Sequence, residues 1–388
     1  MTEMVYGSMP ERVTEPVLPR WWRTIDRWSM TAVLGLFAVG ILLGLAASVP
    51  LAQRNGLDPF YYVQRQAIFG TIALMVMVGL SMATPALVRR LGVLLFILSF
   101  LALAGLPFLG TDFGKGAVRW YSLGFASVQP SEFLKPGFIL LCAWAMAAAQ
   151  EPAGPPGRML SLTATIMVVA LLAIQPDFGQ AALVLFGWGV VYFVAGAPMV
   201  LIGGVIGLVG TAGFAFYNTS EHFARRINGF LTPEIDPRTQ MGYATNAIQE
   251  GGFFGVGVGE GQVKWSLPDA HTDFIIAVAA EEYGLILVLV ILVLYGLIVV
   301  RSLLRLIKER DPFTRLAGAG LACIFGVQAM INIGVAVRLL PAKGMTLPFV
   351  SYGGSSVIAA GITLGFLLAL TRVRPQGQIG DMFRRGRG

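Results

Sequence analysis

Long, mostly uncharged apolar runs recur along almost the whole chain, separated by short polar or proline-containing segments. A helix needs about 20 mostly apolar residues to cross the ~30 Å hydrocarbon core of a bilayer. Hydropathy therefore predicts about ten transmembrane helices, and the fold class is an all-α polytopic membrane protein. The predicted spans lie near residues 30–49, 67–84, 91–109, 131–149, 159–175, 179–196, 198–217, 274–300, 316–338 and 355–371.

The segments outside the spans suggest three regions. Residues 1–29 are predicted to be an N-terminal tail that is too long and too polar for a cleaved signal peptide and that ends in an interfacial Trp/Arg segment. Residues 30–372 form the transmembrane domain, and residues 373–388 form a basic C-terminal tail. One long loop, 218–272, interrupts the spans. Its Gly and aromatic residues (NAIQEGGFFGVGVGEGQVKW) indicate an ordered loop packed on the membrane face.

Composition agrees with this reading and excludes several other classes of protein. Hydrophobic residues make up 56% of the chain and charged residues 13%, against about 25% charged in soluble domains. The net charge of +7 comes from basic residues scattered between spans, which suits anionic lipid neighbours and not nucleic acid. Neither Cys142 nor Cys323 has a second Cys or a His at ligand spacing, so no disulfide framework and no zinc site is expected.

Lysine and arginine in the short loops favour cytoplasmic N- and C-termini. The long loop then lies outside, on the extracytoplasmic face. Several cations also fall on that face, among them Arg119, Lys135, Arg338 and Lys343. The positive-inside rule does not account for them, so they need an explanation of their own.

The end of the long loop carries acids directly into a predicted span, in HTDFIIAVAAEEYG (271–284). Acids are expensive in hydrocarbon and are often functional there. Asp273 lies where the helix begins, so a helix cap and a catalytic acid are equally good interpretations. Glu281 and Glu282 lie two to three turns further along, and for at least one of them we expect an ion pair with an outside cation.

Two other polar clusters fall on the same face. In VQPSEFLKPG (128–137), Glu132 and Lys135 are i, i+3 neighbours, and a self-satisfied pair is favoured over direct catalysis. The segment RLLPAKGMTLPFVSYGGSS (338–356) joins two spans. Irregular backbone of this kind is tolerated at membrane depth only where it lines a cavity or is buried in protein. The three clusters together predict an outward-facing cavity for a lipid-linked anionic substrate.

These motifs are specific enough to suggest a family. The chain resembles the SEDS proteins (shape, elongation, division and sporulation) from about residue 30 to 372. The resemblance is carried by RWYSLGFASVQPSEFLK (119–135), QPDFG (175–179), PDAHTDFIIAVAAEEYG (268–284) and LPAKGMTLPFVSYGGSS (340–356). It implies a membrane glycosyltransferase that polymerises lipid II into peptidoglycan strands. Lys343 and the Gly-Met-Thr after it resemble the division-type members more than the elongation-type ones.

The resemblance also implies roles for individual residues. Asp273 corresponds to the family's essential acid, which favours the catalytic interpretation over the cap. Glu132, Asp177, Glu281 and Glu282 are assigned to structure or positioning. The candidates for binding the pyrophosphate or sugars of the substrate are Lys343, Arg338, Arg119, Lys135, His271, Ser351 and Ser355.

The expected partners are a class B penicillin-binding protein, which is a transpeptidase, and other divisome membrane proteins. The chain itself has no S-x-x-K acylation motif. The resemblance places the protein in the bacterial cytoplasmic membrane at the division septum, with its active site on the outer face.

The predicted reaction inverts the configuration of the sugar, because an α-pyrophosphate donor yields a β-linked polymer. Asp273 would act as general base, and the pyrophosphate can leave as an anion stabilised by cations. A divalent cation (Mg or Mn) is a possible cofactor. The alternatives are a lipid II flippase, an elongation-type polymerase and a non-catalytic divisome scaffold. A flippase should also have polar residues in the inner halves of its spans, and almost none occur there.

Overall fold

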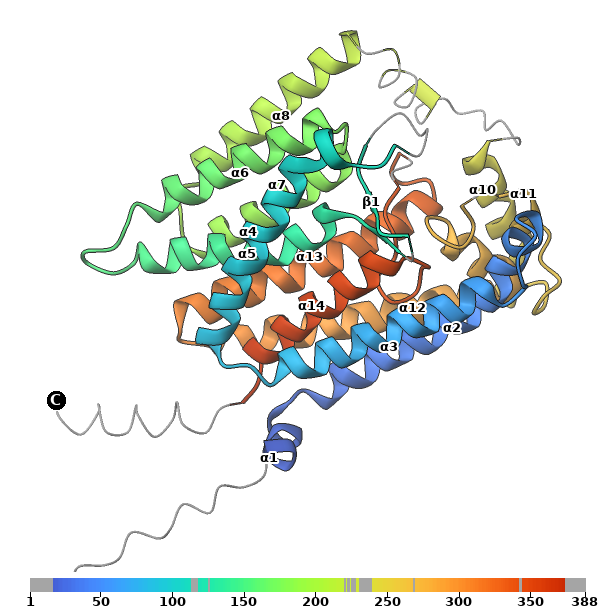
Figure 1. Ribbon diagram of the computed structural model, residues 1–388, viewed down its shortest axis with the longest axis horizontal. Helices are drawn as coiled ribbons and strands as arrows, with labels where there is room; N and C mark the ends of the chain where they lie inside the picture. The colour runs from blue at the N-terminus through green and yellow to red at the C-terminus, as the bar shows by residue number, and fades with distance from the viewer. Residues whose placement is uncertain are drawn as a thin grey trace, which may run out of the picture.

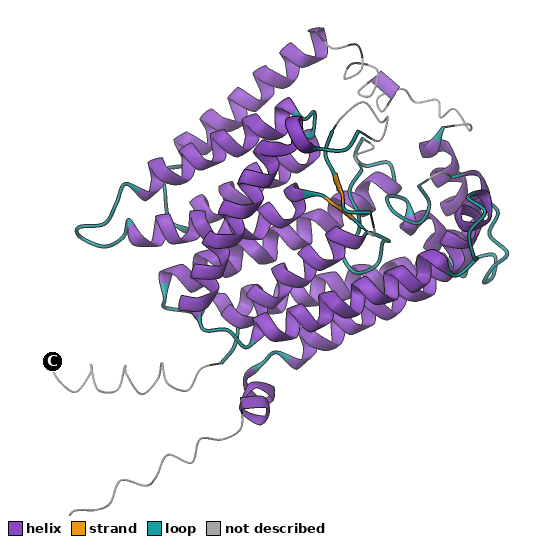
Figure 2. Ribbon diagram, in the orientation of Figure 1, coloured by secondary structure: helices purple, strands orange, loops and turns teal. Residues whose placement is uncertain are grey.

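The computed structural model is a helical bundle with one short β-hairpin (Figures 1 and 2). It describes residues 17–112, 118–124, 126–219, 221, 224, 228–229, 239–267, 269–341 and 344–373. The helices are α1 (Val17–Thr24), α2 (Arg27–Arg54), α3 (Tyr61–Ser81), α4 (Pro85–Leu109), α5 (Pro130–Ala148), α6 (Gly157–Ile174), α7 (Phe178–Val194), α8 (Met199–Thr219), α10 (Gln240–Gly251), α11 (Val263–Ser266), α12 (Ile275–Leu306), α13 (Pro312–Ala336) and α14 (Gly354–Leu370). Strands β1 (Tyr121–Ser122) and β2 (Ser127–Val128) pair antiparallel.

Each of the ten predicted spans corresponds to one apolar helix. Among the described residues, eight helices are long and apolar enough to cross a membrane, and α7 and α14 are shorter apolar helices. The weakly punctuated stretch from 159 to 217 divides into α6, α7 and α8, as predicted. The first span begins at Arg27, slightly earlier than expected, and α1 precedes it inside the predicted tail. The all-α polytopic fold is confirmed.

Small residues allow the helices to approach one another closely. Helix α14 packs against α3, α4 against α5, and α12 against α2 and α13. A Cβ on Gly361 of α14 would lie 2.5 Å from the carbonyl oxygen of Ala73, and one on Gly137 would lie 2.6 Å from the amide nitrogen of Phe96. Contacts of this kind are typical of helices packed within membranes. Helix α8 lies at the edge of the bundle (Figure 1).

An ion cluster around the buried Asp26 joins the end of α12 to the start of α2. Asp26 Oδ1 lies 3.0 Å from Arg301 Nη2 and 3.2 Å from Arg305 Nη2, and Ser29 Oγ donates to Asp26 Oδ2 at 2.9 Å. Burial alone would raise the pKa of Asp26, but hydrogen bonds from Arg301 and Ser29, with the charge of Arg305, hold it below its usual range. This cluster marks one end of the bundle, and α10 and α11 lie at the other (Figure 1).

Helix α12 is broken near that other end. Gly284 has φ 75° and ψ −175°, a conformation that essentially only glycine adopts. The chain that follows α10 packs into the break. The amide of Val256 donates to the carbonyl of Glu281 (2.8 Å), and the amide of Leu285 donates to the carbonyl of Gly252 (2.9 Å). Backbone groups freed by the break are therefore satisfied by the long loop, which confirms that this part of the loop is ordered.

Candidate functional site

Two of the predicted polar segments lie against each other at the end of the bundle that carries α10. The amide of Tyr352 donates to the carbonyl of His271 at 2.9 Å, and Ser351 Oγ donates to the carbonyl of Thr272 at 2.5 Å. Ser351 also accepts from the amide of Leu347 at 2.9 Å, which tightens its own turn. The segment before α12 and the segment before α14 thus form one polar assembly.

Asp273 lies in the turn that leads into α12. Its amide and that of Phe274 donate to the carbonyl of Asp269. The N-cap residue is Phe274, which makes no side-chain capping bond, so the helix-cap interpretation of Asp273 gains no support. Asp273 is half-buried. A Cβ on Gly344 would lie 3.2 Å from Asp273 Oδ2, so the backbone of the second segment passes directly beside the carboxylate.

Asn332 on α13 bonds both the segment before α12 and the segment before α14. Its Nδ2 donates to the carbonyl of Asp273 at 3.0 Å and to that of Met345 at 2.6 Å. The side chain is buried, and among the described residues its Oδ1 has no hydrogen-bond partner. One buried amide therefore fixes the backbone on both sides of the Asp273 carboxylate.

Glu132 and Lys135 form the predicted i, i+3 ion pair, which is confirmed at 2.7 Å between Nζ and Oε2, with both side chains buried. Lys135 Nζ also donates to Gln328 Oε1 at 2.7 Å, and Gln328 Nε2 donates to the carbonyl of Thr346 at 3.3 Å. The polar pair on α5 is thus linked through α13 to the segment beside Asp273.

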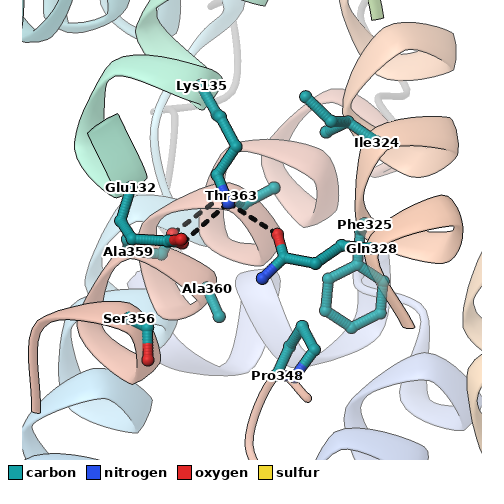
Figure 3. Close-up of a pocket in the computed structure, with 10 residues that line it drawn as sticks. All are labelled: Glu132, Lys135, Ile324, Phe325, Gln328, Pro348, Ser356, Ala359, Ala360 and Thr363. Atoms are coloured by element: carbon teal, nitrogen blue, oxygen red, sulfur yellow. Dashed lines mark hydrogen bonds and ion pairs between the residues drawn. The ribbon is translucent and has the colours of Figure 1, made fainter. Parts of the chain in front are cut away.

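These side chains line a small recess between α5, α13 and α14. Figure 3 shows Glu132 and Lys135 facing Gln328 across it. Its other lining residues are Ile324, Phe325, Pro348, Ser356, Ala359, Ala360 and Thr363. Asp273 does not line this recess. Gln328 and Asn332, on the same helix, connect the recess to the surroundings of Asp273. The candidate site is the surroundings of Asp273, where a carboxylate lies beside the Gly344 backbone.

The QPDFG segment and Gln180, which follows it, lie at the start of α7 beside the Glu132–Lys135 pair. Gln180 Nε2 donates to Glu132 Oε1 at 2.5 Å, and Asp177 caps α7 by accepting from the amide of Gln180. Arg119 donates to the carbonyls of Gln175 (3.1 Å) and Pro176 (2.6 Å). Burial raises the pKa of Asp177, in spite of the positive charge of Arg119 nearby.

His271 lies in an aromatic cluster. Its ring centroid is 5.8 Å from that of Tyr62 and 5.7 Å from that of Tyr352. Burial raises the pKa of Tyr352, although the charge of Arg65 opposes this. The Tyr352 hydroxyl therefore stays protonated near neutral pH.

Glu281 and Glu282 hold the long loop on the broken helix, away from Asp273. Glu282 Oε1 pairs with Lys264 Nζ at 2.6 Å, with both side chains buried, which confirms the predicted ion pair. Glu281 Oε1 accepts from the amides of Gln262 (2.6 Å) and Val263 (3.0 Å). Both acids thus have structural bonds to the loop.

The remaining predicted residues have mixed placements. Ser355 Oγ accepts from the amide of Gln129 at 3.3 Å, between α14 and α5. Arg338 lies just beyond α13, half-buried, with φ 59°. Lys343 lies outside the described residues. The described residues contain no group of three or more His, Cys, Asp or Glu that could hold a metal ion.

Sequence reasoning missed Gln180, Gln328 and Asn332. Each is a buried amide within an apolar helix. The signal was present, because polar side chains inside spans usually bond to a neighbouring helix.

A family model described as "Cell cycle protein", for FtsW, RodA and SpoVE, matches residues 27–376. A protein of Caulobacter vibrioides named "Probable peptidoglycan glycosyltransferase FtsW" is 42% identical over 366 residues, covering 94% of this chain and 93% of that protein. A protein of the same name from Halorhodospira halophila is 33% identical and covers 92% and 94%.

Solved structures agree with these relatives. One chain comes from work described as "Structural coordination of polymerization and crosslinking by a peptidoglycan synthase complex". It has a TM-score of 0.75 and 31% identity, covering 89% of this chain and 97% of that one. The rod shape determining protein RodA of Thermus thermophilus has a TM-score of 0.66 and 30% identity, covering 90% and 97%. With a family match over most of its length and relatives above 30% identity, the chain belongs to the FtsW, RodA and SpoVE family of cell cycle proteins, the SEDS family that its motifs resemble.

Proposed function

We propose that this protein is a peptidoglycan glycosyltransferase that polymerises lipid II, with Asp273 as the general base. The observation that carries the proposal is the placement of Asp273. Its half-buried carboxylate lies beside the Gly344 backbone, and Asn332 fixes the chain on both sides of it. The names of the relatives, which are glycosyltransferases of peptidoglycan, support the reaction class.

In the proposed reaction, Asp273 takes the proton from the acceptor sugar hydroxyl as that oxygen attacks the anomeric carbon of the donor. The bond from this carbon to the pyrophosphate breaks, and the pyrophosphate leaves as an anion with inversion at carbon. A positioned base is typically worth about 10²–10⁴ in rate. Because the leaving group departs as an anion, no second carboxylic acid is needed to protonate it.

We assign the pyrophosphate contacts first to Lys343 and Arg338. Lys343 precedes Gly344 in the sequence, and Gly344 lies beside the Asp273 carboxylate. Lys135 and Arg119 are weaker candidates than their positions in the sequence suggested. Lys135 is buried between Glu132 and Gln328, and Arg119 bonds two backbone carbonyls. We therefore assign Lys135, with Glu132, to positioning.

A divalent cation stays a prediction. Mg²⁺ often binds through one or two carboxylates together with substrate phosphates, and Asp273 is a carboxylate that could share in such binding. The ion would supply charge stabilisation for the departing pyrophosphate.

The cellular setting is proposed from the relatives. The FtsW names favour a division role at the septum of the cytoplasmic membrane, with Asp273 on the outer face. A similar chain occurs in a peptidoglycan synthase complex that couples polymerisation to crosslinking, which supports a class B penicillin-binding protein as the partner.

Purified full-length protein in proteoliposomes, supplied with lipid II alone or together with the partner transpeptidase, tests the proposal. We expect glycan strands on a gel, and a parallel assay for transbilayer movement of labelled lipid II to show no movement above empty liposomes. Movement without strands would replace the proposal with the flippase. If neither strands nor movement appear with the partner present, only the scaffold function would remain.

A further inference from the structure

The turn that follows α10 exposes a cluster of large apolar side chains. Its four members, here called the apolar tip, are Phe253, Phe254, Val256 and Val258, with exposed fractions of 67%, 82%, 44% and 68%. The nine residues from 251 to 259 contain no charge. Exposed apolar patches of this kind mark contact with a membrane, a protein or a ligand.

The break in α12 fixes the depth of the apolar tip. The loop pairs with α12 on both sides of Gly284, through Val256 with Glu281 and through Leu285 with Gly252. Gly284 is 17 residues before Arg301, which belongs to the ion cluster with Asp26 at the other end of the bundle. Those residues span at most about 25 Å at 1.5 Å each, and tilt shortens the distance along the membrane normal.

A hydrocarbon core of about 30 Å that has one boundary at Arg301 therefore reaches the level of Gly284. The sixteen residues between them, 285–300, carry no charge. Four of the first six side chains after the break, Leu285, Ile286, Leu289 and Val290, are large, apolar and exposed, as expected of a lipid-facing wall. The apolar tip thus lies at the edge of the hydrocarbon, on the same end of the bundle as Asp273.

The loop is held rigidly at this level. Gly255 lies so close to the helix that a Cβ would be 2.2 Å from the carbonyl oxygen of Glu282, and Gly284 approaches the carbonyl oxygen of Phe253 equally closely. The buried Lys264–Glu282 pair holds α11, which follows the apolar tip, against α12. The exposure of the apolar tip is consequently a fixed feature of the fold.

We propose that the apolar tip is inserted among the lipid acyl chains of the leaflet on the Asp273 side of the membrane. Acyl chains fit because the surface is wholly apolar, is continuous with the lipid-facing part of α12 and lies at the boundary depth. Transfer of large apolar side chains from water into lipid is favourable. The proposal does not depend on the reaction that Asp273 performs.

Spin-label accessibility in proteoliposomes tests it. Single cysteines Phe254→Cys and Val258→Cys, in a Cys142→Ala/Cys323→Ala background of the full chain, are labelled and compared for collision with oxygen and with a water-soluble nickel complex. Val293→Cys, at an exposed apolar position in the middle of α12, is the lipid reference. Glu260→Cys, at the exposed acid of the same loop, is the aqueous reference.

Labels at 254 and 258 should resemble the label at 293, with oxygen reaching them several-fold better than nickel. Nickel access equal to that at 260 would overturn the proposal and identify an aqueous docking surface. Exclusion of both reagents would also overturn it, because the tip would then be covered by protein. Repeating that measurement after dilution with excess lipid would show whether the covering protein is a second copy.

Discussion

Replacing Lys135 alone should destabilise the protein more than replacing Lys135 and Glu132 together. In Lys135→Met, the buried Glu132 carboxylate keeps the amide of Gln180 but loses its only cation in the described structure. Replacing one partner of a buried ion pair typically lowers the free energy of unfolding by about 3–5 kcal/mol, whereas replacing both with uncharged residues often changes it little. The double variant Glu132→Gln/Lys135→Met should therefore recover most of the loss.

The magnitude follows from the length of the chain. An unfolding entropy of about 2.1 cal/mol/K per residue gives roughly 0.8 kcal/mol/K for 388 residues. Lys135→Met should then lower Tm by about 4–6 °C, and the double variant should stay within about 2 °C of wild type. Thermal unfolding in detergent, followed by tryptophan fluorescence, measures both.

Arg90→Met is the matched control, because Arg90 is exposed and surface changes usually stay within about 0.5 kcal/mol. A double variant as unstable as Lys135→Met would refute the reasoning, since the loss would then come from packing and not from an uncompensated buried charge.

Three further changes test other parts of the structure. Burial raises the pKa of Asp177 above its usual 3.8, so the folded state binds the proton of this carboxyl more tightly than the unfolded state does. The resulting stabilisation is complete below the pKa of the unfolded state and is lost as the pH rises through the pKa of the folded state. The Tm of Asp177→Asn relative to wild type should therefore increase between about pH 4 and pH 7, and a flat or falling difference contradicts this. Gly284→Ala would place a Cβ 2.2 Å from the carbonyl oxygen of Phe253, in a backbone conformation that essentially only glycine adopts. Its Tm should therefore fall by an amount equivalent to about 2 kcal/mol or more. The control Gly296→Ala, where a Cβ on the same helix meets open space, should not lower Tm. Asn332→Leu removes the two hydrogen bonds that Asn332 Nδ2 donates to the carbonyls of Asp273 and Met345. It should lower the kcat of folded protein at least about tenfold with little change in KM; equal effects on kcat and KM would count against a positioning role.

The positions of the spans could be read from the sequence because most of the apolar runs are long enough to cross a bilayer by themselves. The break in α12 could not. The sequence around Gly284 carries no proline or turn motif that would indicate a break, and the freed backbone groups are satisfied by residues 252–257, which pack into it. The GVGVGEG stretch (255–261) superficially resembles a nucleotide loop, but its glycines serve the backbone conformation of this turn and, at Gly255, its packing on α12. Gly255, Gly257 and Gly259 all have positive φ, and Gly255 meets the helix directly.

The charged residues of the candidate site could be predicted from the sequence, but the hydrogen bonds and ion pairs that join them to other helices could not. The Glu132–Lys135 pair follows from helical spacing alone, since three residues bring both side chains to one face. Lys264 and Glu282 are 18 residues apart across a turn, and Asn332 reaches Asp273 from a different helix. Such contacts depend on how the helices pack, which hydropathy does not specify.

Substitution of Asp273 tests the central claim most directly. Asp273→Asn keeps the size of the side chain and removes the base, and Asp269→Asn, in the same turn, is the matched control. Both purified proteins are reconstituted with lipid II and the partner transpeptidase, and the initial rate of glycan synthesis is measured together with Tm. Asp273→Asn should unfold within a few degrees of wild type and polymerise at least about 100-fold more slowly, while Asp269→Asn stays close to wild type. A folded Asp273→Asn protein that polymerises within a few-fold of the wild-type rate would contradict the assignment of Asp273 as the base.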